Sequence, residues 1–117
     1  MKDAPYRYSN CKVLRCVDGD TVDLLVDCGF GIFTKKRIRL HGINCPESRT
    51  RDLEEKARGK AATAAMVEML KDGVCDLESH AIGKFGRVLG TLWIGHLNLN
   101  TQMIVYGHAV EYTGGKR

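Results

Sequence analysis

The sequence predicts a mainly β (α+β) fold, with five short strands, a long helix between the third and fourth strands, and a short helix after the fifth. Strand-like runs rich in Val and Leu alternate with glycine-containing turns, and one alanine-rich segment carries an apolar helical stripe. A chain of 117 residues has room for one domain. This order of elements matches the five-stranded Greek-key β-barrel of the OB type, although an open α+β sheet would show the same periodicity.

The first three strands are expected over residues 11–17, 21–28 and 34–41. The first two runs are rich in Val, Leu and Cys and flank Asp18-Gly19-Asp20, which is typical of a hairpin turn. In the third run, Ile38 and Leu40 alternate with Arg37 and Arg39, so one face of the strand is charged. A turn then begins at Gly42.

Residues 53–71 contain no proline and five alanines, and they predict the long helix. Its apolar face consists of Ala62, Ala65, Met66, Met69 and Leu70. Gly73 follows as the expected C-terminal cap. The last two strands are expected over 74–79 and 88–94, joined by a glycine-bearing segment at 82–86. Asn98 or Asn100 is expected to cap a short helix through Tyr106, which Gly107 would end.

Composition narrows the class of protein. The 44% hydrophobic and 27% charged fractions are those of a globular chain, so we expect one domain over 1–117 with its core at about 11–112 and a flexible tail at 113–117. No apolar run approaches the roughly 18 residues of a membrane span, so no membrane partner is expected. The polar start has no leader-like stretch, which favours a cytoplasmic location.

Five cysteines without CxxC spacing, and scattered histidines, argue for reduced thiols and against a zinc enzyme.

The charges are unevenly distributed along the chain. The net charge is +4, from 18 basic and 14 acidic residues. Residues 16–34 contain four aspartates and neither Lys nor Arg, whereas residues 35–60 contain nine basic and four acidic side chains. An acidic pocket beside a basic field suits a cation and a polyanion together.

Two groups of oxygen donors stand near predicted strand ends. Asp18 and Asp20 flank a glycine, and two close carboxylates are costly without a cation or donors, although Asp-Gly is also ordinary hairpin chemistry. Asn44, Cys45, Pro46 and Glu47 follow the charged-face strand in a loop that can present side-chain and backbone oxygens. Such hard ligands favour calcium or magnesium, whereas the alternative is a Pro-containing turn with one solvated glutamate.

Three cations complete the candidate site. Arg39 lies inside the third strand, and Lys84 and Arg87 surround the glycine turn. A planar guanidinium matches two phosphate oxygens, so these positions suit phosphate binding. The alternative is that each is an ordinary solvated charge.

Four strings together resemble one known family. VDGDTV at 17–22, RIRLHGINCPE at 37–47, GKFGR at 83–87 and LNTQMIVYGHA at 99–109 resemble the staphylococcal nuclease (thermonuclease) family in order and spacing. The resemblance covers about residues 11–112 and implies an OB-fold barrel. It also implies a calcium-dependent phosphodiesterase, an endonuclease that cleaves DNA and RNA with little sequence specificity and leaves 3′-phosphate ends. Single-stranded or unpaired substrates and a monomer are expected.

Carried over by position, the resemblance assigns roles to single residues. The implied catalytic residues are Arg39, Glu47 and Arg87. The implied calcium ligands are Asp20, Asn44 and the Cys45 backbone carbonyl, with Asp18 in the outer shell. The implied substrate-binding residues are Lys84, Phe85 and Tyr112.

The sequence departs from the family pattern at three kinds of position. Asn44 stands where the family usually has a metal-binding aspartate, which removes one charge while keeping an oxygen ligand. Gly83 replaces a commonly acidic residue, and Phe85 lacks the hydroxyl of the usual tyrosine. The chain also ends soon after Tyr112, where the prototype continues into a third helix. If Asn44 costs the site its efficient calcium binding, the alternative function is an inactive or weakly active OB-fold nucleic-acid-binding module. An interaction domain without a nucleic-acid role would leave Arg39, Glu47 and Arg87 unexplained.

Overall fold

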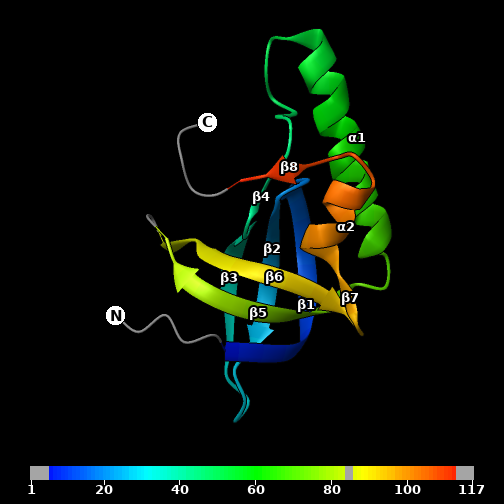
Figure 1. Ribbon diagram of the computed structural model, residues 1–117. Helices are drawn as coiled ribbons and strands as arrows, with labels where there is room; N and C mark the ends of the chain where they lie inside the picture. The colour runs from blue at the N-terminus through cyan, green and yellow to red at the C-terminus, as the bar shows by residue number, and fades with distance from the viewer. Residues whose placement is uncertain (1–5, 84–85, 113–117) are drawn as a thin grey trace.

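The computed structural model describes residues 6–83 and 86–112 and forms a β-barrel with two helices at one end (Figure 1). Its longer elements are β1 (Tyr6–Asp18), β2 (Thr21–Asp27), β3 (Phe33–Leu40), α1 (Leu53–Met69), β5 (Val74–Ile82), β6 (Val88–Ile94) and α2 (Leu99–Val105). Three two-residue strands, β4 (Ile43–Asn44), β7 (Leu97–Asn98) and β8 (Val110–Glu111), were not predicted. Residues 113–117, the predicted flexible tail, lie outside the described residues.

The sheet closes on itself. Antiparallel pairing gives the order β3-β2-β1-β5-β6, and β3 also pairs with β6 in parallel, with Ile38 opposite Val88 and Leu40 opposite Gly90. That last pairing makes a mixed five-stranded barrel instead of an open sheet. The prediction of an OB-type α+β barrel with a helix between its third and fourth strands is therefore confirmed.

Strand β1 is longer than the predicted 11–17, because it belongs to both halves of the barrel. Its first half pairs with β5 and its second half pairs with β2. Between them the register shifts after Tyr8, and Asn10 adopts a positive φ of 56°. The extra residues, Tyr6 to Asn10, are half-buried or exposed and polar, so they lack the apolar run from which the strand was predicted.

The helical predictions hold to within two residues at each end. On α1, Ala62, Met66 and Leu70 are buried, and Ala65 and Met69 pack against the core. Asn98, one of the two predicted caps, accepts a hydrogen bond from the Thr101 N–H (3.1 Å) at the start of α2. The other candidate cap, Asn100, is buried, and its side chain bonds to backbone groups of the barrel instead. Neither helix in the described chain is long and apolar enough to span a bilayer.

Two glycines let α1 approach the loops at the upper end of the barrel. A Cβ on Gly19, in the β1–β2 turn, would lie 2.7 Å from the Ala62 Cβ. A Cβ on Gly59, inside α1, would lie 2.5 Å from the Glu47 carbonyl. Real Cβ atoms do not make such contacts, so the helix can lie against both loops only because these positions are glycine.

Asn100 links α2 to the barrel through its side-chain amide. Its Nδ2 donates to the carbonyls of His41 (2.9 Å) and Gly90 (3.0 Å), and its Oδ1 accepts from the Leu92 N–H (3.2 Å). The residue is 4% exposed, so backbone groups that lost this amide could not form hydrogen bonds with water instead.

We predict that Asn100→Ala lowers the free energy of unfolding by about 2–4 kcal/mol, because the His41 carbonyl and the Leu92 N–H lose a buried partner. Asn98→Ala removes only a helix cap and should cost about 1 kcal/mol. Urea denaturation of the two variants measures the difference. Equal losses would show that the Asn100 bonds contribute no more than a cap does.

Candidate active site

A buried carboxylate lies at the centre of the candidate site. Asp20 is 6% exposed and follows the β1–β2 turn. Its Oδ2 accepts from the Cys45 N–H (2.9 Å), its Oδ1 accepts from the Thr21 hydroxyl (3.2 Å), and its carbonyl accepts from the Leu40 N–H (2.8 Å). One residue therefore joins the turn, the end of β3 and the loop after β4.

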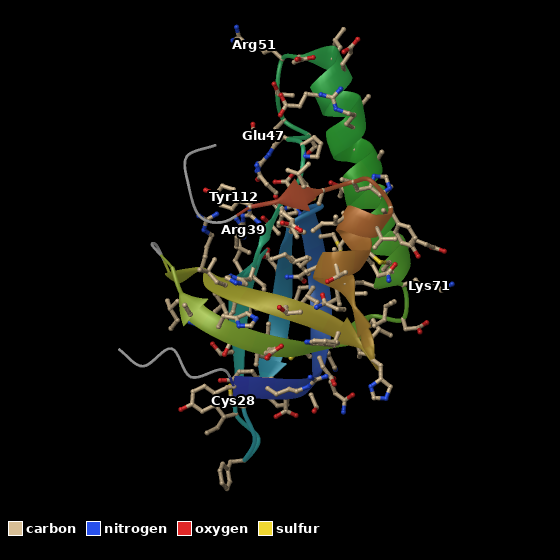
Figure 2. All side chains as sticks on the ribbon, in the orientation of Figure 1. Cys28, Arg39, Glu47, Arg51, Lys71 and Tyr112 are labelled. Atoms are coloured by element: carbon tan, nitrogen blue, oxygen red, sulfur yellow. The ribbon has the colours of Figure 1, made fainter. Side chains whose placement is uncertain are left out.

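Arg39 is fixed beside this carboxylate, and Figure 2 shows it near Tyr112. Its Nη2 lies 3.6 Å from Asp20 Oδ2 and donates to Asn44 Oδ1 (3.1 Å), and its Nη1 donates to the Leu40 carbonyl (2.9 Å). The guanidinium carbon is 5.8 Å from the centre of the Tyr112 ring, and the Arg39 side chain is only 11% exposed. Tyr112 is held in turn by its N–H, which donates to the Gly42 carbonyl (2.9 Å). The structure thus brings Arg39, Asp20, Asn44, Cys45 and Tyr112 together.

The donors at this point suit a hard cation. The oxygens of Asp20 and Asn44 converge on the same nitrogen of Arg39, so they already attract one positive group. Each Asp20 oxygen accepts one short hydrogen bond, and a carboxylate offers about four lone-pair sites in all, so capacity remains for a metal. Carboxylate, amide and carbonyl oxygens are the ligands that calcium takes in proteins.

The number of anionic ligands is small. Within the described ranges, His, Cys, Asp and Glu side chains do not gather in any group of three that could hold a metal. A calcium site here would depend on one buried carboxylate, supplemented by the Asn44 amide and the Cys45 carbonyl. Asn44, which stands where the family usually has an aspartate, is also the residue that accepts a hydrogen bond from Arg39.

Asp18 lies at the edge of the cluster. Its Oδ1 accepts from the Ser48 hydroxyl (2.7 Å), and its Oδ2 is 4.0 Å from Arg49, whose side chain is 78% exposed. Screening by water makes that ion pair weak. Among the bonds of the described residues, none joins Asp18 to Asn44 or Arg39.

Glu47 lies on the next stretch of the same loop, above Arg39 in Figure 2. Its N–H donates to Glu55 Oε2 (3.2 Å), and its carbonyl faces Gly59, so α1 holds its backbone at two points. The side chain is exposed and borders a hollow shared with Glu55 and Arg58. The backbone of Glu47 is thus held against the helix.

Arg87 comes just before the start of β6, the strand that pairs in parallel with β3. It is exposed and lines a hollow with Lys35, Lys36 and Arg37 of β3. Arg37 is held by Asp23 through two hydrogen bonds (2.8 and 3.1 Å), and this guanidinium lowers the pKa of the Asp23 carboxyl. The predicted substrate residues Lys84 and Phe85 lie outside the described residues.

Buried thiols provide no nucleophile here. Burial raises the pKa of Cys11 to about 11 and that of Cys75 to about 12, so both remain protonated at neutral pH. The two residues lie opposite each other where β1 pairs with β5 and belong to the core.

Sequence reasoning missed three residues that position the site. Glu55 was detectable, because Asp52-x-x-Glu55 is a capping-box spacing, and Asp52 does cap α1 while Glu55 reaches the Glu47 N–H instead. Ser48 and Gly59 carried no signal, because a loop serine and a helical glycine are both unremarkable until the loop is seen against the helix.

Comparison with known proteins supports the resemblance. The family model described as staphylococcal nuclease homologue matches residues 37–117. Protein ParB of Escherichia coli is 31% identical over 110 residues, an alignment covering 86% of this chain and 56% of ParB. A protein of Oryza sativa subsp. japonica, "Probable staphylococcal-like nuclease CAN2", is 25% identical over 111 residues, covering 84% of this chain and 28% of the rice protein.

The chain thus spans about half the length of ParB and little more than a quarter of the rice protein. The family match nevertheless includes the end of β3, the loop after β4, both helices and the β5–β6 connection. The catalytic candidates Arg39, Glu47 and Arg87 all lie within it. On this evidence the chain belongs to the staphylococcal nuclease homologue family.

Proposed function

We propose that this chain is a calcium-dependent nuclease that hydrolyses phosphodiester bonds of DNA and RNA with little sequence specificity and leaves 3′-phosphate ends. Family membership supports a nuclease-type function. The observation that carries the proposal is the Arg39 guanidinium, held between the buried Asp20 and Asn44 beneath the Tyr112 ring.

Arg39 suits the binding of a phosphate in its transition state. Three contacts fix its planar fork before any substrate arrives, so little reorganisation is needed when charge develops on the phosphate oxygens. Preorganised donors in a water-poor site are worth far more than the same donors in water.

Glu47 is the proposed general base. It would orient or deprotonate the attacking water, and its exposed side chain leaves room for that water. Arg87 would offset charge on the far side of the phosphate. Its exposed position beside Lys35 and Lys36 allows it to meet a backbone that arrives along β3.

Asp20, Asn44 and the Cys45 carbonyl would hold the calcium ion, with Asp18 in the outer shell. When bound there, calcium supplies polarisation of the scissile phosphate. Asp20 would keep this set together, because it also binds the Cys45 N–H.

Weak sequence specificity follows from the type of side chain present. The proposed contacts are made by Arg and Lys, which bind phosphates of any sequence.

The alternative, an OB-fold binding module without efficient catalysis, is favoured by one observation, namely the neutral amide of Asn44 at the metal position.

The direct test is cleavage of labelled single-stranded DNA and RNA. We expect cleavage with calcium, none in excess EDTA, and products whose 3′ ends can be extended by a polymerase only after phosphatase treatment. Full activity in EDTA would contradict calcium dependence. Binding without cleavage in calcium would favour the binding module.

We further predict that Arg39→Lys lowers kcat about 10²- to 10³-fold, because a lysine cannot reproduce a fixed fork that bonds Leu40 and Asn44 at once. The matched control is Arg37→Lys, two residues earlier on the same face of β3, where the side chain pairs with Asp23. Steady-state kinetics should show a change of no more than about threefold in that control, within the small worth of an exposed ion pair. Equal losses in the two variants would assign the effect to strand β3 as a whole.

A further inference from the structure

A second hollow lies at the opposite end of the barrel from Asp20. It has a volume of about 240 Å³ and is lined by Tyr6, Tyr8, Cys28, Thr34, Lys36 and His80, together with apolar core residues. Cys28 follows the far end of β2, whereas Asp20 precedes its start, and Figure 2 shows Cys28 well separated from Arg39, which lies beside Asp20. Nothing in the proposed catalytic site uses this cavity.

The cavity is chemically suited to a flat ring. Its lining is mainly apolar, and two phenol rings border it, Tyr6 and Tyr8, whose centres are 6.5 Å apart and whose planes are inclined by 38°. Tyr6 is 65% exposed, so one ring remains available for stacking. His80 and Lys36 add polar groups at the edge, and His80 Nε2 is already 2.9 Å from the Thr91 hydroxyl.

Cations lie beside the cavity, in the hollow next to it. Lys36 lines both this cavity and the neighbouring hollow, in which Lys35, Arg37 and Arg87 also lie. Asp23 engages Arg37, whereas among the described residues no ion pair involves Lys35, Lys36 or Arg87. Three positive groups are therefore left for an anion beside a cavity for a ring.

Strand β3 connects this end with the catalytic site. Thr34 borders the cavity and Arg39 binds Asp20, and the five residue steps from Thr34 to Arg39 span about 17 Å at 3.3 Å per residue. Because side chains alternate between faces, Thr34 and Lys36 lie on one side of the strand and Lys35 and Arg39 on the other, and Lys36 lines the hollows on both sides. A single strand of a few nucleotides could follow β3 from one end to the other.

We propose that the cavity is a nucleobase subsite for single-stranded nucleic acid, in which one base stacks on Tyr6 while its backbone phosphates contact Lys36, Lys35 and Arg87. The inference deepens the proposed nuclease function and rests on it. Stacking on an aromatic ring accepts every base, so the subsite would add affinity and preference for unpaired strands without reading sequence.

The neighbouring hairpin tip offers a competing occupant. Phe30 is fully exposed and Ile32 is 59% exposed, next to the lysines of β3, which would also fit an anionic lipid surface. Nucleic acid is the better fit, because a bilayer would contact the tip but would not fill a ring-sized cavity beside the path to Arg39.

The test compares two fluorescein-labelled strands of equal length, an oligothymidylate and a base-free tetrahydrofuran-phosphate strand. Affinities are measured by fluorescence anisotropy in EDTA, so that cleavage cannot intervene. We expect the parent to prefer the base-bearing strand. Tyr6→Ser should weaken binding of that strand about five- to tenfold, the lower part of the range expected for loss of one stacked base. It should leave the base-free strand unchanged, and because Tyr6 is exposed the variant should fold.

Lys36→Gln should weaken binding of both strands and reduce the salt dependence of binding by about one counterion. The control, Lys71→Gln, removes another exposed charge, just after the C-terminal end of α1, and should change neither affinity. Equal effects of Lys36→Gln and Lys71→Gln would show that only net charge matters, which would overturn the subsite.

The remaining outcomes separate this inference from the proposed function. If the parent cleaves DNA in calcium but Tyr6→Ser binds both strands as the parent does, only the subsite is wrong. If the base preference depends on Tyr6 but the parent cleaves nothing, the subsite stands and the nuclease proposal fails. If neither strand binds while phosphatidylserine vesicles bind and Phe30→Ser abolishes that binding, this end is a lipid surface and the subsite is wrong.

Discussion

The candidate site depends on one buried carboxylate. Asp20 is nearly inaccessible to water, yet it contacts the Cys45 N–H, the Thr21 hydroxyl and the Arg39 guanidinium. A buried anion is tolerated only when charge and hydrogen bonds compensate it, so the loop after β4 and the end of β3 must meet at this point. The same residue that organises the loop is therefore the one best placed to hold a cation beside Arg39.

Close helix packing adds the second constraint. Gly19 allows the β1–β2 turn to approach Ala62, and Gly59 allows α1 to touch the Glu47 backbone. Glu47 is thereby positioned by the helix, and Arg39 is positioned by the barrel. The two proposed catalytic groups thus rest on different supports, so packing between α1 and the barrel sets their relation. Arg87 rests on a third support, the β5–β6 connection, beside the basic residues of β3.

Much of the fold was predictable from the sequence, because the spacing of apolar residues indicates which face of a strand or helix is buried. Charged and apolar residues alternate along β3, which predicts its two faces. Apolar residues recur at helical spacing along α1, which predicts the side that packs on the core. The N-terminal half of β1 could not be read, since Tyr6 to Asn10 are stabilised by pairing with β5 rather than by an apolar face. For the site, the family resemblance supplied the residue types, but the Arg39–Asn44 bond, the Ser48–Asp18 bond and the Glu47 contact with Gly59 depend on tertiary approach.

The central claim is that Asp20 and Asn44 form a calcium site beside Arg39, and Asn44→Asp tests it most directly. The change adds a charge at a proposed ligand while preserving its size, and affinity in oxygen sites rises with ligand charge. Thermal unfolding is followed against calcium concentration, with Asn98→Asp as a control that adds the same charge at the cap of α2. The account predicts that calcium raises the Tm of the parent, and that Asn44→Asp reaches half of this rise at a several-fold lower calcium concentration while Asn98→Asp does not. The same midpoint in all three proteins would show that Asn44 is not a ligand and would contradict the account.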